Sequence, residues 1–288
     1  MNPEHRNLFS MSLFGDISMI KEATKNQISD VIERKLRLDD PWYQLIMKML
    51  QSVAYGFDGQ RMIEVGCGVG GFLINAAQNG AIIIGLDIST NAVHTARDLV
   101  KSLGLQANVD LEVGDAQFLP FKDQAGDVVI CAETLEHVPD YEEAFKEIVR
   151  ITSRSGYLCL TVPNFFSTAF FENVILLLVG QPGYVKSRVC VEKERVFHVF
   201  KLRKLLSQGN VEVITLRSVD FLHLPPRVRK ILKVDNSLRI ISEKLEDFFV
   251  NINSPLRLMG ANIGVLAKKK RFVCTREEEI CITKPKLP

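Results

Sequence analysis

Short apolar runs alternate with segments of helical periodicity through the middle of the chain. The runs are rich in Val, Ile and Leu and are bounded by Gly, Asp or Pro, which is typical of buried strands. Five strands are predicted in this way, over residues 62–65, 81–86, 109–113, 127–131 and 156–162. Because helical segments separate them, we expect a parallel sheet covered by helices on both faces, which is a doubly wound α/β fold.

Helices are predicted before, between and after these strands. One begins at Pro41, one near Phe72, and one after a cap at Ser89 or Thr90, while two more cover residues 140–151 and 202–208. Beyond residue 164 the alternation weakens, although strands are still predicted over 211–219 and 262–267.

One domain with two insertions is the simplest organisation. A helical segment over residues 1–44 precedes the main domain at 45–268, and a tail over 269–288 follows it. Two irregular blocks at about 164–196 and 221–260 interrupt the regular pattern. Because no repeat or low-complexity linker divides the chain, both blocks are expected to belong to the same domain.

Composition narrows the class of protein. The 288 residues are 47% hydrophobic, enough for a full core, and the net charge of +2 does not indicate a nucleic-acid binder. The six cysteines form no CxxC pair, so neither a zinc site nor a disulfide framework is predicted. No signal peptide is predicted, and the longest apolar run is too short to be expected to span a bilayer. A soluble, cytoplasmic protein is therefore expected, and the sequence indicates no oligomeric state.

A glycine-rich turn follows the first predicted strand and satisfies two patterns. The glycines at 66, 68 and 71 fit a dinucleotide fingerprint, with Asp87 at the usual distance to bind a ribose. The second pattern is EVGCGVG at 64–70, where Glu64 precedes the first glycine by two residues. A carboxylate there favours a cationic amino-acid moiety and would repel a pyrophosphate.

Several motifs in order resemble the class I S-adenosylmethionine-dependent methyltransferases. EVGCGVG resembles their motif I, Asp87 in GLDIS their ribose-binding acid, and Asp115 in GDA the acid that meets adenine. The segments 127–140 and 156–164 resemble the family's fourth and fifth strands. NIGVLAKKK at the end resembles its antiparallel seventh strand, which implies a Rossmann-like seven-stranded sheet. The resemblance implies an S-adenosylmethionine site formed by Glu64, Gly66, Cys67, Gly68, Gly70, Asp87, Ile88, Asp115, Ala116 and Glu133.

Each of these residues also has a purely structural interpretation. The glycines could serve only a tight turn, and Glu64 could be a paired structural acid. Asp87 could be a helix cap, and Asp115 could form an Asx turn with the backbone two residues on.

The segment after the fourth strand offers candidate chemistry for the methyl acceptor. Glu133, Glu136 and His137 lie there, and the cluster resembles that of ubiquinone-biosynthesis O-methyltransferases and of small-RNA 3′-end 2′-O-methyltransferases, with His198 as the further ligand. That resemblance implies a Mg²⁺ site. Alternatively no metal is involved, and His137, with Glu133, acts as a metal-free base or acceptor contact. A merely structural role is the third interpretation.

The two irregular blocks are expected to form an acceptor lid. Their aromatic residues favour a small-molecule or lipid-like acceptor, such as a quinone precursor. The alternative is that these aromatic side chains only pack the two blocks onto the core. A basic amphipathic helix predicted over 227–249 is compatible with an anionic membrane surface or with an ordinary solvent-facing helix. The sequence thus predicts a methyltransferase acting at oxygen. The alternatives are an NAD-linked oxidoreductase and a non-catalytic S-adenosylmethionine-binding protein.

Overall fold

A computed structural model of the chain describes residues 41–53, 59–164, 197–219 and 260–270, with the single residues 244, 248 and 258. The predicted N-terminal pattern over 1–40, the aromatic-rich block, the basic helix and nearly all of the tail lie outside the described residues. No helix in the described part of the chain is long and apolar enough to cross a membrane.

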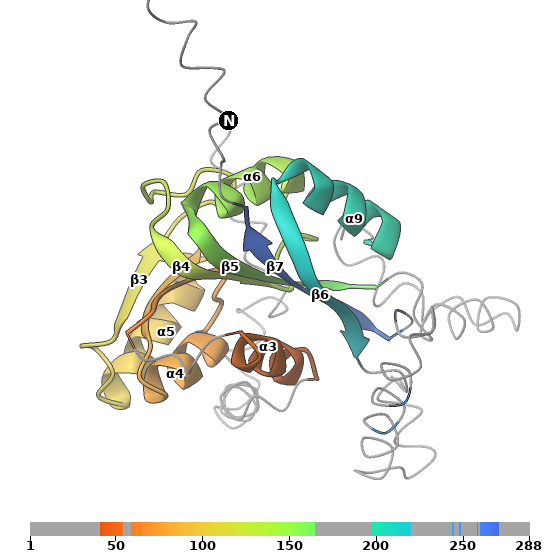
Figure 1. Cartoon of the computed structure of the whole chain (residues 1–288). Helices are drawn as coiled ribbons and strands as arrows, with labels where there is room; N and C mark the ends of the chain where they lie inside the picture. The colour runs from red at the N-terminus through yellow and green to blue at the C-terminus, as the bar shows by residue number, and fades with distance from the viewer. Residues whose placement is uncertain are drawn as a thin grey trace, which may run out of the picture.

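Seven strands form one sheet in the order β3-β2-β1-β4-β5-β7-β6 (Figure 1). Their bounds are β1 Arg61–Val65, β2 Ile82–Asp87, β3 Val109–Val113, β4 Gly126–Ala132, β5 Thr152–Pro163, β6 Val211–Val219 and β7 Asn262–Lys269. Neighbouring strands from β3 to β5 are parallel, whereas β7 runs antiparallel to both β5 and β6. The predicted Rossmann-like sheet with an antiparallel last strand is confirmed.

Helices cover both faces of this sheet (Figure 1). Helices α3 (Pro41–Gln51), α4 (Gly71–Gln78) and α5 (Thr90–Ser102) lie on one face, and α6 (Tyr141–Ile151) and α9 (Val199–Gln208) on the other. Consecutive strand residues alternate between the two cores, as Met62 and Ile63 do. The strands read as unbroken apolar runs because both of their faces are buried.

Local signals in the sequence set most helix ends. Ser89 Oγ accepts a hydrogen bond from the backbone of Ala92 (3.2 Å) and starts α5, and Asp140 does the same for Glu143 (3.0 Å) at α6. Gly104, with φ +70°, follows α5. The predicted cap at Ser89 is confirmed, and Asp140 caps α6 at the start of the predicted helix.

Strand β5 begins earlier than predicted. Thr152 pairs with Gly126, and the register then shifts before Tyr157 pairs with Val128. Ser155 lies in the left-handed region (φ 65°) inside this irregular stretch. The segment is polar and carries no apolar alternation, so only backbone pairing with β4 makes it a strand, and sequence pattern does not reveal it.

The residues that flank the two irregular blocks lie together. Asn164, at the start of the first block, bridges to Phe197 after it. The Asn164 amide also donates to the backbone oxygens of Leu258 and Gly260, each at 2.8 Å, where the second block ends. This buried asparagine therefore joins the point where the first block leaves the sheet to the point where the second returns.

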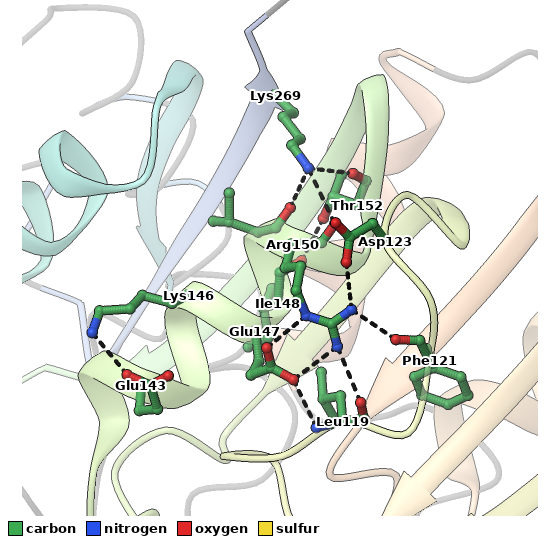
Figure 2. A network of polar contacts seen from close by, with 11 residues as sticks. Leu119, Phe121, Asp123, Glu143, Lys146, Glu147, Ile148, Arg150, Thr152 and Lys269 are labelled. Carbon is green, nitrogen blue, oxygen red and sulfur yellow. Dashed lines mark hydrogen bonds and ion pairs between the residues drawn. The ribbon is translucent and has the colours of Figure 1, made fainter.

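Polar contacts tie the C-terminus of α6 to the adjoining loop and to β7 (Figure 2). Arg150 donates to both carboxylate oxygens of Glu147 (2.6 and 2.8 Å) and to Asp123 (2.8 Å). Lys269 Nζ donates to the backbone oxygens of Val149, Arg150 and Thr152, at 2.6, 3.2 and 2.7 Å. A cation from β7 thus satisfies carbonyls that the end of a helix leaves unpaired.

Loss of the Arg150 side chain should destabilise the protein in a pH-dependent way. The hydrogen bond from Arg150 lowers the pKa of Glu147 below its ordinary value. That contribution is present above the pKa of Glu147 in the unfolded chain and is lost as pH falls through its lowered folded value. We expect Arg150→Leu to reduce the free energy of unfolding by about 2 kcal/mol near neutral pH. The difference from the wild type should narrow in acid, as followed by urea denaturation.

Lys146→Leu is the matched control for this variant. Lys146 pairs with Glu143 on the same helix at the same spacing, but the two side chains are 70% and 41% exposed, against 30% and 17% for Arg150 and Glu147. Such an exposed pair should contribute little to stability, because solvent screens the two charges. Equal losses for the two variants would contradict the importance assigned to the Arg150 contacts.

Candidate functional site

The predicted site residues gather at the carboxyl edge of the sheet. The glycine turn follows β1, Asp87 ends β2, Asp115 follows β3 and Glu133 follows β4. These four strands are parallel neighbours, so their carboxyl ends share one edge. That edge is where open α/β sheets bind their ligands.

Gly66, Gly68 and Gly70 in the turn all have positive φ but serve different purposes. A Cβ on Gly66 (φ +78°) would lie 2.2 Å from Thr134 Oγ1, so this position is closed by packing. A Cβ on Gly68 (φ +54°) would meet nothing within 4 Å, so open space adjoins that backbone. Gly70 (φ +85°) is the N-cap of α4. Only Gly68 therefore shows the open approach that a ligand requires.

Asp87 ties the glycine turn to the end of β2. Its Oδ2 accepts from the backbone N–H of Gly68 (2.8 Å), and its Oδ1 accepts from that of Ser89 (2.8 Å). Since Ser89 caps α5, the helix-cap interpretation of Asp87 is wrong. Each carboxylate oxygen has two lone pairs, so the group has capacity for further donors such as ribose hydroxyls.

Asp115 does form the Asx turn that the sequence allowed. Its Oδ1 accepts from the backbone N–H of Gln117 (2.9 Å), and the Gln117 amide also contacts both carboxylate oxygens at 3.0 Å. Gln117 Oε1 in turn accepts from the backbone of Asp140 (2.9 Å), the N-cap of α6. Sequence analysis missed Gln117, although an amide two residues after a turn acid is the signal that could have found it.

The remaining predicted cofactor residues differ in exposure. Glu64 is a buried carboxylate (3% exposed) in the middle of the sheet, and Ala116 is also buried. Ile88 is 45% exposed beside Asp87, so its apolar side chain is accessible at this edge. Burial, together with the charges of Glu64 and Asp87, raises the pKa of the Cys67 thiol. Cys67 is therefore a protonated packing residue of the turn rather than a nucleophile.

Glu133 has the least ordinary backbone of the site. It is not glycine, yet its φ is +49°, directly after β4. Its backbone N–H donates to the carbonyl and the hydroxyl oxygen of Thr161, at 3.0 and 3.2 Å. Its Oε2 accepts from the side-chain amide of Asn262 at 2.7 Å. Neighbouring strands thus hold both the backbone and the carboxylate of this residue.

The predicted metal ligands do not assemble. Among the described residues, which include Glu133, Glu136, His137 and His198, no three His, Cys, Asp or Glu side chains could together hold a metal ion. His198 is instead the N-cap of α9, where its Nδ1 accepts from the backbone of Lys201 (3.1 Å). Glu136 is buried, and its Oε1 lies 3.8 Å from His137 Nε2. The predicted Mg²⁺ site thus does not fit this arrangement of residues.

The fold and the ordered motifs along its carboxyl edge resemble those of class I, S-adenosylmethionine-dependent methyltransferases. A family model described as a methyltransferase domain matches residues 63–160, from β1 to β5. S-adenosylmethionine-dependent methyltransferases are among the solved structures that the chain resembles.

Two curated relatives illustrate the sequence similarity. Norajmaline N-methyltransferase of Rauvolfia serpentina is 38% identical over 95 residues, which are 33% of this chain and 32% of that protein. Ubiquinone biosynthesis O-methyltransferase of Coxiella burnetii is 34% identical over 118 residues, 41% of this chain and 49% of that protein. The chain therefore matches between a third and a half of the length of these relatives.

Structural similarity extends further along the chain. The crystal structure of the [4+2]-cyclase SpnF has a TM-score of 0.56 and 20% identity, covering 81% of this chain and 85% of that one. At this identity the likeness shows the fold alone. The same sheet thus serves a protein described as a cyclase as well as methyltransferases, so the reaction has to be argued from the site.

Alanine at two glycines should separate packing from ligand binding. Gly66→Ala combines a left-handed backbone with a collision against Thr134 and should cost more than about 2 kcal/mol of stability. Gly68→Ala should cost only about 1 kcal/mol, the penalty of the left-handed backbone, because its Cβ would enter open space. That Cβ should nevertheless weaken S-adenosylhomocysteine binding at least about tenfold, if the backbone approaches the ligand closely.

Urea denaturation and calorimetric titration of the two variants test this pair. Equal losses of stability, or unchanged affinity in Gly68→Ala, would contradict the distinct purposes assigned to the two glycines.

Proposed function

We propose that this chain transfers a methyl group from S-adenosylmethionine to a small or lipid-like acceptor, at oxygen. The observation that carries the proposal is the meeting of Glu64, the glycine turn, Asp87 and Asp115 along three adjacent strand ends. This set lies in a segment that matches a methyltransferase domain.

The residues offer a complementary group for each part of the cofactor. The open side of Gly68 leaves room for close backbone approach, and Asp87 has capacity for the two ribose hydroxyls. Asp115, held by Gln117, is the acceptor proposed for the adenine amino group. Glu64 supplies negative charge suited to the amino-acid moiety of a sulfonium cofactor. This charge, with the antiparallel β7, disfavours the NAD-linked alternative.

The chemistry requires alignment more than activation. The sulfonium supplies an already activated methyl group, so the protein has to orient the acceptor in line with it and exclude water. An oxygen acceptor must also lose its proton, for which a positioned base typically contributes about 10²–10⁴-fold.

His137 is the candidate base. Its side chain is 23% exposed, and the buried Glu136 carboxylate lies 3.8 Å from its Nε2. The proposed reaction uses no metal ion, because the four candidate ligands, all among the described residues, do not assemble around a metal. An acceptor nitrogen, as the similarity to an N-methyltransferase allows, would need no such base.

Cofactor binding is the first test of this proposal. Wild-type protein should bind S-adenosylhomocysteine in calorimetry and should not bind NADH. Asp87→Ala should weaken that binding at least about tenfold, because it removes a charged acceptor of hydrogen bonds. Asp98→Ala, an exposed acid on α5, is the control and should leave affinity unchanged. If the wild type binds no S-adenosylhomocysteine, the proposed function fails.

Methyl transfer is the second test. S-adenosylmethionine with a labelled methyl group should methylate at least one member of a panel of catechols, hydroxylated quinone precursors and aromatic amines. For a hydroxyl acceptor, His137→Gln should lower kcat by about 10²-fold or more while leaving S-adenosylhomocysteine affinity unchanged. EDTA should not change the rate. Transfer only to amines would show that the methylated atom is nitrogen and not oxygen. Cofactor binding without any methyl transfer would favour the non-catalytic alternative.

A further inference from the structure

We propose that Asn262 is a positioning residue of the methyl-transfer site, which holds the Glu133 carboxylate in place from the opposite side of β5. The inference rests on the proposed function, since Glu133 belongs to the cofactor site only by its place at the carboxyl edge of the sheet. Its support is the hydrogen bond of 2.7 Å from Asn262 Nδ2 to Glu133 Oε2, between residues 129 positions apart in sequence.

The Glu133 backbone needs contacts to keep its shape. A non-glycine residue in the left-handed region costs on the order of 1–3 kcal/mol and persists only where its surroundings hold it. Thr161, on β5, accepts from the Glu133 N–H through both of its oxygens. Asn262 then fixes the side chain, so two strands determine where this carboxylate lies.

The antiparallel direction of β7 makes this contact available. Asn262 is the first residue of β7, and its backbone is paired with Pro163 of β5 on one side and Val219 of β6 on the other. Had β7 run parallel to β5, its first residue would lie at the opposite edge of the sheet. The reversed strand instead brings a rigidly held amide to the carboxyl edge, within reach of the residue after β4.

The position of Glu133 is connected to the glycine turn through the next residue. Thr134 Oγ1 donates to Ala132 (2.9 Å) and lies 3.4 Å from the carbonyl of Val65. The same side chain closes the space above Gly66. A shift of residues 133–134 would therefore move the side chain that packs against Gly66, and with it the glycine turn proposed to bind the cofactor.

Binding measurements on Asn262 variants test the proposal. Asn262→Leu keeps much of the volume but removes the donor, and Asn262→Asp keeps the shape but places a second negative charge beside Glu133. Each should weaken S-adenosylhomocysteine binding about tenfold in calorimetry, as expected for loss of a hydrogen bond to a charged group. Asn262→Gln, which keeps the amide, should recover part of the affinity.

Asn108→Leu is the matched control. The Asn108 amide also donates a hydrogen bond, in this case to the backbone oxygen of Ala81 at 3.5 Å, but it lies at the amino edge of the sheet. This variant should leave affinity unchanged, while its thermal unfolding temperature shows what loss of an asparagine amide does to stability alone.

A double-mutant cycle separates positioning from general support of the fold. If Asn262 acts through Glu133, then Asn262→Leu should change affinity less than about twofold in a Glu133→Ala background. An equal effect in both backgrounds, or no loss of affinity in Asn262→Leu and Asn262→Asp, overturns the inference alone. Absence of S-adenosylhomocysteine binding by the wild type overturns the proposed function together with the inference.

Discussion

The reversal of winding direction between β1 and β4 is the constraint on which the site depends. These strands are hydrogen-bonded neighbours, but the chain leaves them toward opposite faces: α4 packs into the core below β1, and α6 into the core on the other side of β4. The two connections must therefore diverge at the carboxyl edge. The glycine turn and the segment of Glu133 line this divergence, which is why the candidate chemistry gathers there.

Side-chain hydrogen bonds and packing hold this edge in shape in the absence of a ligand. Asp87 joins the glycine turn to β2, Gln117 joins the turn of Asp115 to the cap of α6, and Thr134 fills the space above Gly66. A site prepared in this way loses less conformational freedom on binding, so more of its interaction energy appears as affinity. Asp87 and Asp115 thereby combine a structural role with capacity for a ligand, and the two interpretations of Asp115 are compatible.

Sequence pattern was sufficient for the architecture of the described region. Every strand and helix described between Pro41 and Lys269 was predicted, because both faces of the sheet are buried and each element has its own apolar period. The start of β5 was missed, because polar residues 152–155 become a strand only through pairing with β4. The predicted metal site failed for a different reason, since local capping geometry turns His198 toward its own helix.

The sequence by itself determined the succession of strands and helices along the chain, the glycine turn after β1, and the acids Glu64, Asp87 and Asp115 in or after β1, β2 and β3. These features are local, so residue types and their spacing along the chain are enough to predict them. Tertiary structure alone decided which distant side chains support the acids. Gln117 meets the cap of α6, and Asn262 meets Glu133 across β5, only because the strand order and the reversed direction of β7 bring them together. Such pairings depend on register and strand direction, and no spacing along the chain records them.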